Sequence, residues 1–148
     1  MRLPRLLAAA LLIAASLLSL AGCGSQPADK PAAAGAPLEV GLVFDVGGRG
    51  DKSFNDAAYA GLERAQKELG VHFTTLETSE GADREAQLRQ LAAGPAQVVF
   101  GVGFLFSDDI KSLAKEFPEK KFACVDFTVT PGESLPPNLV ALTFKEEE

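Results

Sequence analysis

The chain has 148 residues, of which 20 are acidic and 14 are basic, and 47% of the residues are hydrophobic. This length predicts a single domain, and the charge and apolar content exclude a disordered chain. A net charge of −6 without a cluster of Lys or Arg argues against a nucleic-acid partner, because phosphate binding needs concentrated positive charge. The single His and the two widely spaced residues Cys23 and Cys124 match no common metal or disulfide pattern.

The N-terminus resembles a bacterial lipoprotein export signal. Two arginines precede an apolar run over residues 6–20, which is too short for a comfortable membrane span. The residues LAGC at 20–23 resemble a lipobox, in which the peptide is cut before Cys and the thiol is lipidated. An ordinary signal with a chance Cys is the alternative. We predict a signal peptide over 1–22, then a lipidated Cys23 and a flexible Pro/Ala/Gly tether to residue 37. The lipid would anchor the protein to the cell membrane, with the folded part facing the periplasm or the cell exterior.

The rest of the chain alternates short apolar runs with segments of helical periodicity. The apolar runs predict strands over 38–44, 71–76, 96–101, 121–126 and 139–144. Apolar residues at helical spacing, with stop signals after them, predict helices over 54–69, 83–93 and 107–117. Such alternation predicts right-handed βαβ crossovers, and therefore an α/β fold with a mainly parallel sheet and flanking helices.

Polar and aromatic residues follow the first, third and fourth predicted strands, where a parallel sheet binds ligands. They are Asp45, Gly47, Gly48, Phe54, Asn55, Gly103 and Asp126. Carboxylates accept hydrogen bonds from the paired hydroxyls of a sugar or ribose, and a Phe beside an Asn suits a flat heterocycle. The sequence therefore predicts a site for an uncharged, hydroxylated small molecule that contains a ring.

Several of these polar and apolar residues also have structural alternatives. Asp51 or Ser53 is a candidate N-cap of the first helix, and Asp56 would complete an S-x-x-D capping box. Phe54 would in that case pack under the sheet. Cys124 lies in an apolar run and is predicted to be a small buried hydrophobe.

Two glycine loops resemble nucleotide-binding motifs but fail their templates. A P-loop needs Gly where this chain has Val46 and Asp51, and the GxG at 101–103 continues to Phe106 where a dinucleotide motif needs Gly. The chain has no GxSxG motif, and His72 is predicted to lie at a surface or strand edge. We therefore predict no enzyme activity, no metal and no cofactor.

Four segments together resemble one known family. They are VGLVFDVGGRGDKSFNDAAYAGLERA (40–65), GVGFLFSD (101–108), FACVDF (122–127) and NLVALTFKEEE (138–148). Their sequences and their order along the chain resemble the basic membrane protein family, the substrate-binding lipoproteins of nucleoside ABC importers. The resemblance implies a type I periplasmic-binding-protein fold.

The resemblance also implies roles for the predicted site residues. Asp45 would contribute to the ligand site, and Asp126 would line the same pocket near the nucleoside. Phe54 would stack on a purine base, and Asn55 would hydrogen-bond to it. The three site glycines would keep the backbone close to the ligand. The implied partners are a nucleoside and the permease and ATPase subunits of an ABC importer, to which the ligand is handed without reaction.

Family members have two lobes that close on the ligand, and the resemblance here covers the first. We therefore expect residues 38–148 to be an incomplete N-terminal lobe whose half-site binds ligand weakly, because one side of the ligand stays in water. Two alternatives stay open at this point. The same fold would also suit a sugar or a flavin-like vitamin, and an exported α/β sensor or interaction protein would need no transporter.

Overall fold

The computed structural model describes residues 35–78 and 83–145. The strands within these ranges are β1 (Glu39–Phe44), β2 (His72–Glu77), β3 (Val98–Val102), β4 (Lys121–Val125) and β5 (Leu139–Leu142). The helices are α2 (Phe54–Leu69), α3 (Arg84–Ala93) and α4 (Ser107–Glu116), with a 3-10 turn, η1 (Phe104–Phe106), before α4. The predicted signal peptide, Cys23 and most of the tether lie outside the described residues. None of the helices described has the length and apolar character needed to cross a membrane.

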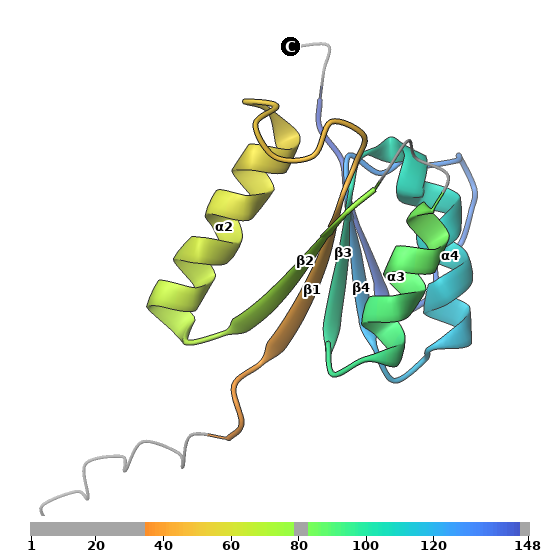
Figure 1. The fold of residues 1–148 in the computed structure, drawn as a ribbon. Helices are drawn as coiled ribbons and strands as arrows, with labels where there is room; N and C mark the ends of the chain where they lie inside the picture. The colour runs from red at the N-terminus through yellow and green to blue at the C-terminus, as the bar shows by residue number, and fades with distance from the viewer. Residues whose placement is uncertain (1–34, 79–82, 146–148) are drawn as a thin grey trace, which may run out of the picture. The chain divides into compact units, whose positions relative to one another are not determined.

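The strands form one sheet in the order β2-β1-β3-β4-β5, and every neighbouring pair is parallel. This confirms the predicted α/β class. All the strands therefore end at the same edge, which is the upper edge in Figure 1, and α2 begins at that edge. We call it the carboxyl edge of the sheet.

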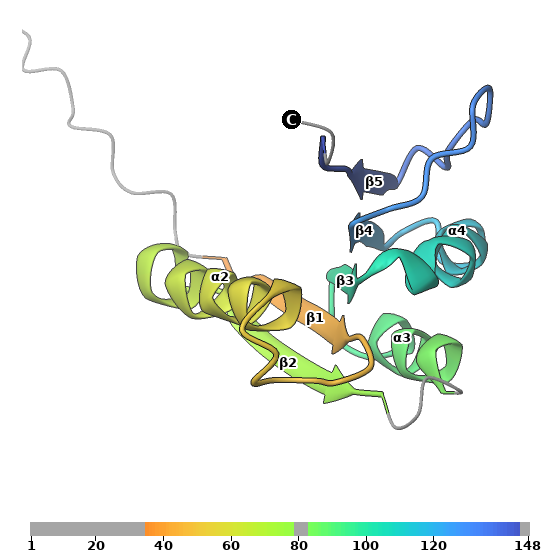
Figure 2. The ribbon, with the colours of Figure 1, turned by 90° about the horizontal axis from the view of Figure 1, so that it is seen from above.

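The sheet face that carries α3 and α4 is well covered (Figure 2). The strand side chains pointing to this face, such as Val99, Phe122 and Cys124, are at most 1% exposed and pack with Leu88 and Ile110 of the two helices. Burial of this apolar cluster supplies the main stabilisation of the fold, at about 25 cal/mol for each Å² removed from water.

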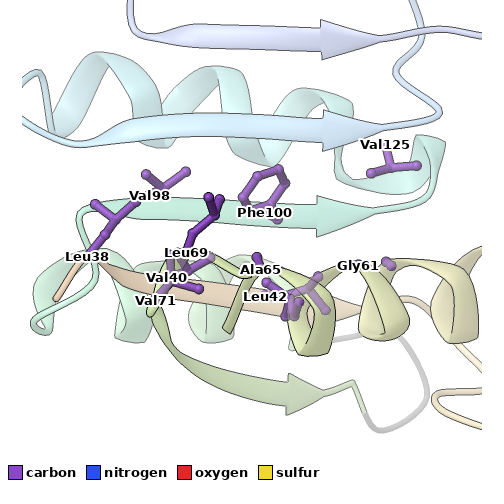
Figure 3. Close-up of a pocket in the computed structure, with 12 residues that line it drawn as sticks. Leu38, Val40, Leu42, Gly61, Ala65, Leu69, Val71, Val98, Phe100 and Val125 are labelled. Atoms are coloured by element: carbon purple, nitrogen blue, oxygen red, sulfur yellow. The ribbon is translucent and has the colours of Figure 1, made fainter. Parts of the chain in front are cut away.

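The opposite face is covered by α2 over β1, but α2 does not extend over β4 and β5 (Figure 2). There Val140 is 57% exposed and Leu142 is 41% exposed. An apolar groove of about 360 Å³ runs between α2 and the sheet, lined by residues such as Phe100 and Leu69 (Figure 3). Near-continuous apolar strands are typical of sheets that are buried on both faces. In the described residues, however, the face of β4 and β5 opposite α3 and α4 is left partly exposed.

The ends of the elements show where sequence patterns were accurate and where they were not. The helix over 54–69 has the predicted bounds, because Gly70 adopts the left-handed conformation (φ 70°) and donates its N–H to the Gln66 carbonyl. The last strand was predicted to run to Phe144 but ends at Leu142. The fourth ends at Val125, because the next residue, Asp126, has a left-handed φ of 62°.

Candidate functional site at the carboxyl edge of the sheet

The loop that follows β1 returns to the strand end through Asn55. This residue lies in the first turn of α2, is 3% exposed, and its Oδ1 accepts the backbone N–H of Asp45 at 3.2 Å. The amide carbonyl is therefore occupied by the protein, which leaves the Nδ2 donors of Asn55 as the part suited to a ligand. The hydrogen bond fixes the start of α2 beside the end of β1.

The Asp45 carboxylate lies between its own loop and the end of β3. Its Oδ1 accepts the backbone N–H of Val46 at 2.7 Å, and its Oδ2 lies against Gly103. A Cβ atom on Gly103 would come within 2.4 Å of that oxygen, and the φ of 107° at this glycine is unfavourable for other residues. Gly103 is therefore required for the carboxylate to take this position.

Cys124 connects the second predicted carboxylate to the first. Its thiol is fully buried, as predicted, and donates to the Gly103 carbonyl at 3.5 Å. Burial is the largest cause that raises the pKa of the Cys124 thiol to about 12, and the negative charges of Asp126 and Asp45 contribute to the same rise. The Gly103 N–H also donates to the Val125 carbonyl at 2.9 Å, so Gly103 lies between the Asp45 carboxylate and the end of β4, where Asp126 follows.

Exposed aromatic rings lie at the same edge. Phe54, at the start of α2, is 40% exposed and therefore does not pack under the sheet. Its ring centroid lies 5.4 Å from that of Phe144, with 53° between the ring planes. Phe104 in η1 is 56% exposed. Sequence reasoning placed Phe144 inside a strand. It placed Phe104 in the segment after the third strand but did not select it as a site residue.

The two glycines after β1 make the turn into the loop. Gly47 and Gly48 have φ values of 100° and 55°, which suit glycine. A Cβ on Gly48 would lie 3.0 Å from the Glu77 carboxylate at the end of β2, whereas nothing lies within 4 Å of a Cβ on Gly47. Farther along this loop, the Arg49 guanidinium stacks 3.5 Å from the centre of the Tyr59 ring.

The α2 N-terminus is capped by Asp51, and the predicted Ser-based box is not formed. The Asp51 carboxylate accepts the backbone N–H groups of Ser53, Asn55 and Asp56 at 2.9–3.1 Å, whereas the Ser53 side chain makes no capping bond. The Asp56 carboxylate instead accepts the N–H groups of Gly50 and Lys52. Of the two N-cap candidates, the structure therefore uses Asp51, whose carboxylate satisfies several donors at once.

This cap predicts a pH-dependent contribution to stability. The backbone hydrogen bonds from Ser53, Asn55 and Asp56 lower the pKa of Asp51 below its ordinary value of 3.8. The contribution is therefore complete above that value and is lost as the pH falls through the lowered pKa. We expect Asp51→Asn to have a lower melting temperature than the wild type near neutral pH, with a difference that narrows below pH 3.8. A constant difference down to about pH 2 would contradict this linkage.

The apolar groove beside α2, His72 and the described acidic residues do not form a second polar site of this kind. The apolar groove beside α2 contains none of the predicted site residues, and its lining side chains carry no hydrogen-bonding groups (Figure 3). His72, as predicted, is exposed at the edge strand β2, where its Nδ1 pairs with Glu39. Within residues 35–78 and 83–145, no three His, Cys, Asp or Glu side chains are grouped so that they could hold a metal ion.

Comparison with known proteins places this geometry in a family. Residues 38–148 match the family model for ABC transporter substrate-binding proteins that are PnrA-like. A lipoprotein of Pyrococcus horikoshii is 40% identical over 93% of this chain and 33% of its own length. The ABC transporter nucleoside-binding protein BmpA of Lactococcus lactis is 28% identical over 97% of this chain and 41% of its own.

The solved structures agree with the family match. The crystal structure of an ABC transporter solute-binding protein from Aeropyrum pernix K1 has a TM-score of 0.66 and 36% sequence identity, covering 74% of this chain and 29% of that one. This chain thus spans about a third of the length of these relatives. The parallel sheet, the loop after β1 and the match over residues 38–148 together show that the chain belongs to the PnrA-like family of ABC transporter substrate-binding proteins.

Proposed function

We propose that the carboxyl edge of the sheet is one side of a binding site for a purine nucleoside, in a lipoprotein that delivers this solute to an ABC importer. The observation that carries the proposal is the position of Asp45, Asn55 and Asp126 at one edge of the sheet, beside the exposed ring of Phe54. Carboxylates suit the ribose hydroxyls, and an exposed ring suits the base. The nucleoside-binding name of the Lactococcus lactis relative supports the same solute class.

The site would work by binding and release, without a chemical step. In this proposal residues 38–148 form the first lobe, and Gly47, Gly48 and Gly103 let the backbone approach the solute. The proposed anchor is a lipidated Cys23 at the end of a signal peptide over residues 1–22, which agrees with the lipoprotein name of the Pyrococcus relative. Permease and ATPase subunits would be the partners that receive the solute.

An NMR titration of the chain from residue 23 onward, with Cys23→Ser to prevent lipidation, tests the solute class. Adenosine and inosine are expected to shift the amide signals of Asp45, Asn55 and Asp126 with weak affinity, because one side of the ligand stays in water. Shifts caused by glucose or riboflavin but not by nucleosides would overturn the nucleoside assignment. A nanomolar dissociation constant would contradict the half-site argument.

Two variants of Asn55 separate its two functions. Asn55→Asp keeps an oxygen that can accept the Asp45 N–H but removes the Nδ2 donors, whereas Asn55→Ala removes both. If the donors contact the base, both variants lose the preference for purine nucleosides over riboflavin, and Asn55→Asp does so while Asp45 keeps its wild-type amide signal. Retained preference in Asn55→Asp would exclude this contact.

A further inference from the structure

Phe144 is an aromatic residue with no role in the core of the described structure. It lies on the segment that leaves β5, is 53% exposed, and belongs to neither of the two buried clusters. Its ring lies 5.4 Å from that of Phe54, which is also outside both clusters. The contact therefore joins two half-exposed rings at the carboxyl edge, and we expect it to affect the position of these rings rather than the packing of the core.

The spacing of the two rings decides what the pair can do. A flat ligand ring inserted between two parallel rings needs a separation of about 7 Å, because each contact takes about 3.5 Å. Phe54 and Phe144 are 5.4 Å apart and tilted by 53°, which is a favourable aromatic geometry without space for a third ring. Phe144 is therefore not the second wall of a stacking slot.

We propose that Phe144 is a positioning residue for Phe54: its tilted contact holds the Phe54 ring so that the opposite face is presented to the ring of the solute. This role rests on the proposed function, in which the solute stacks on Phe54. An exposed Phe ring otherwise samples several rotamers, and binding would then have to immobilise it. Because Phe144 lies on the segment after β5, a shift of that segment changes the affinity of the site, and ligand binding biases the segment in return.

The test combines a ligand-free signal with an affinity. In chain 23–148 carrying Cys23→Ser and ¹³C-labelled Phe, Phe144→Ala is expected to move the Phe54 ring signals toward averaged values in the absence of ligand. The same variant is expected to weaken adenosine binding by roughly two- to tenfold, the range expected from loss of one aromatic pair. Phe144→Tyr, which keeps a ring, should restore both the signals and the affinity.

Leu69→Ala is the matched control, because this side chain is exposed and lies at the other end of α2 from Phe54. It should leave the Phe54 signals and the affinity unchanged. If the wild type binds adenosine and Phe144→Ala changes neither the Phe54 signals nor the affinity, the positioning role is overturned. A moved Phe54 signal with unaltered affinity would overturn it as well. Absence of adenosine binding by the wild type overturns the proposed function itself and removes this role with it, so the two failures are distinguished by the wild-type titration.

Discussion

Gly103→Ala is expected to destabilise the fold and to displace the Asp45 carboxylate at the same time. Gly103 has φ 107° and ψ 149°, a region that is essentially restricted to glycine, so backbone strain alone costs about 1–3 kcal/mol. The added Cβ would also lie 2.4 Å from Asp45 Oδ2, a distance that no relaxed contact shows. Urea unfolding should show the loss of stability, and the Asp45 amide signal should move.

Gly61→Ala is the matched control for this substitution. Gly61 is exposed in the middle of α2, and nothing lies within 4 Å of the position of a Cβ there. Alanine is a better helix former than glycine by about 1 kcal/mol, so this variant is expected to be more stable than the wild type. Wild-type stability in Gly103→Ala, or an unmoved Asp45 signal, would show that the backbone at the end of β3 can accommodate a Cβ atom. Glycine would then not be needed at this position.

Periodicity predicted the elements of this fold well, because its signals are local. The apolar spacing of α2 and the glycine after it lie within one stretch of sequence, and the helix has the predicted bounds. The ends of the strands were predicted less accurately. The run that contains β5 was predicted to continue to Phe144, whereas strand pairing ends at Leu142. Pairing depends on the neighbouring strand, which a single segment of sequence does not contain.

The positions of the predicted site residues were predictable to the level of the sheet edge, but their contacts were not. The rule that ligands bind beyond parallel strands was sufficient to bring Asp45 and Asp126 together. The choice of Asp51 rather than Ser53 as the capping residue depends on how the loop folds back, and the pairing of Phe144 with Phe54 joins residues 90 positions apart. Such long-range contacts depend on the geometry of the whole sheet.

Phe106→Ala is expected to cause the largest loss of stability among these variants. The Phe106 ring is fully buried in the cluster under α3 and α4, and it packs on the backbone of Gly101, where a Cβ would come within 2.9 Å of the ring. Removing a core Phe ring costs about 3–5 kcal/mol, a large part of the 5–15 kcal/mol that stabilises a typical domain. Phe106 is also the last residue of η1, and its backbone N–H donates to the Gly103 carbonyl at 3.2 Å, so the buried ring and this turn are held at the same place.

Phe104→Ala is the control for Phe106→Ala. It separates the loss of stability caused by a cavity in the core from any loss caused by removing an aromatic ring from the same turn. Phe104 lies two residues earlier in the same turn but is 56% exposed, so its truncation should change the free energy of unfolding by no more than about 0.5 kcal/mol. Urea unfolding followed by circular dichroism measures both variants. Equal losses in the two would mean that the turn, rather than the buried ring, stabilises the end of β3, and that Asp45 and Gly103 are held in place by the loop itself.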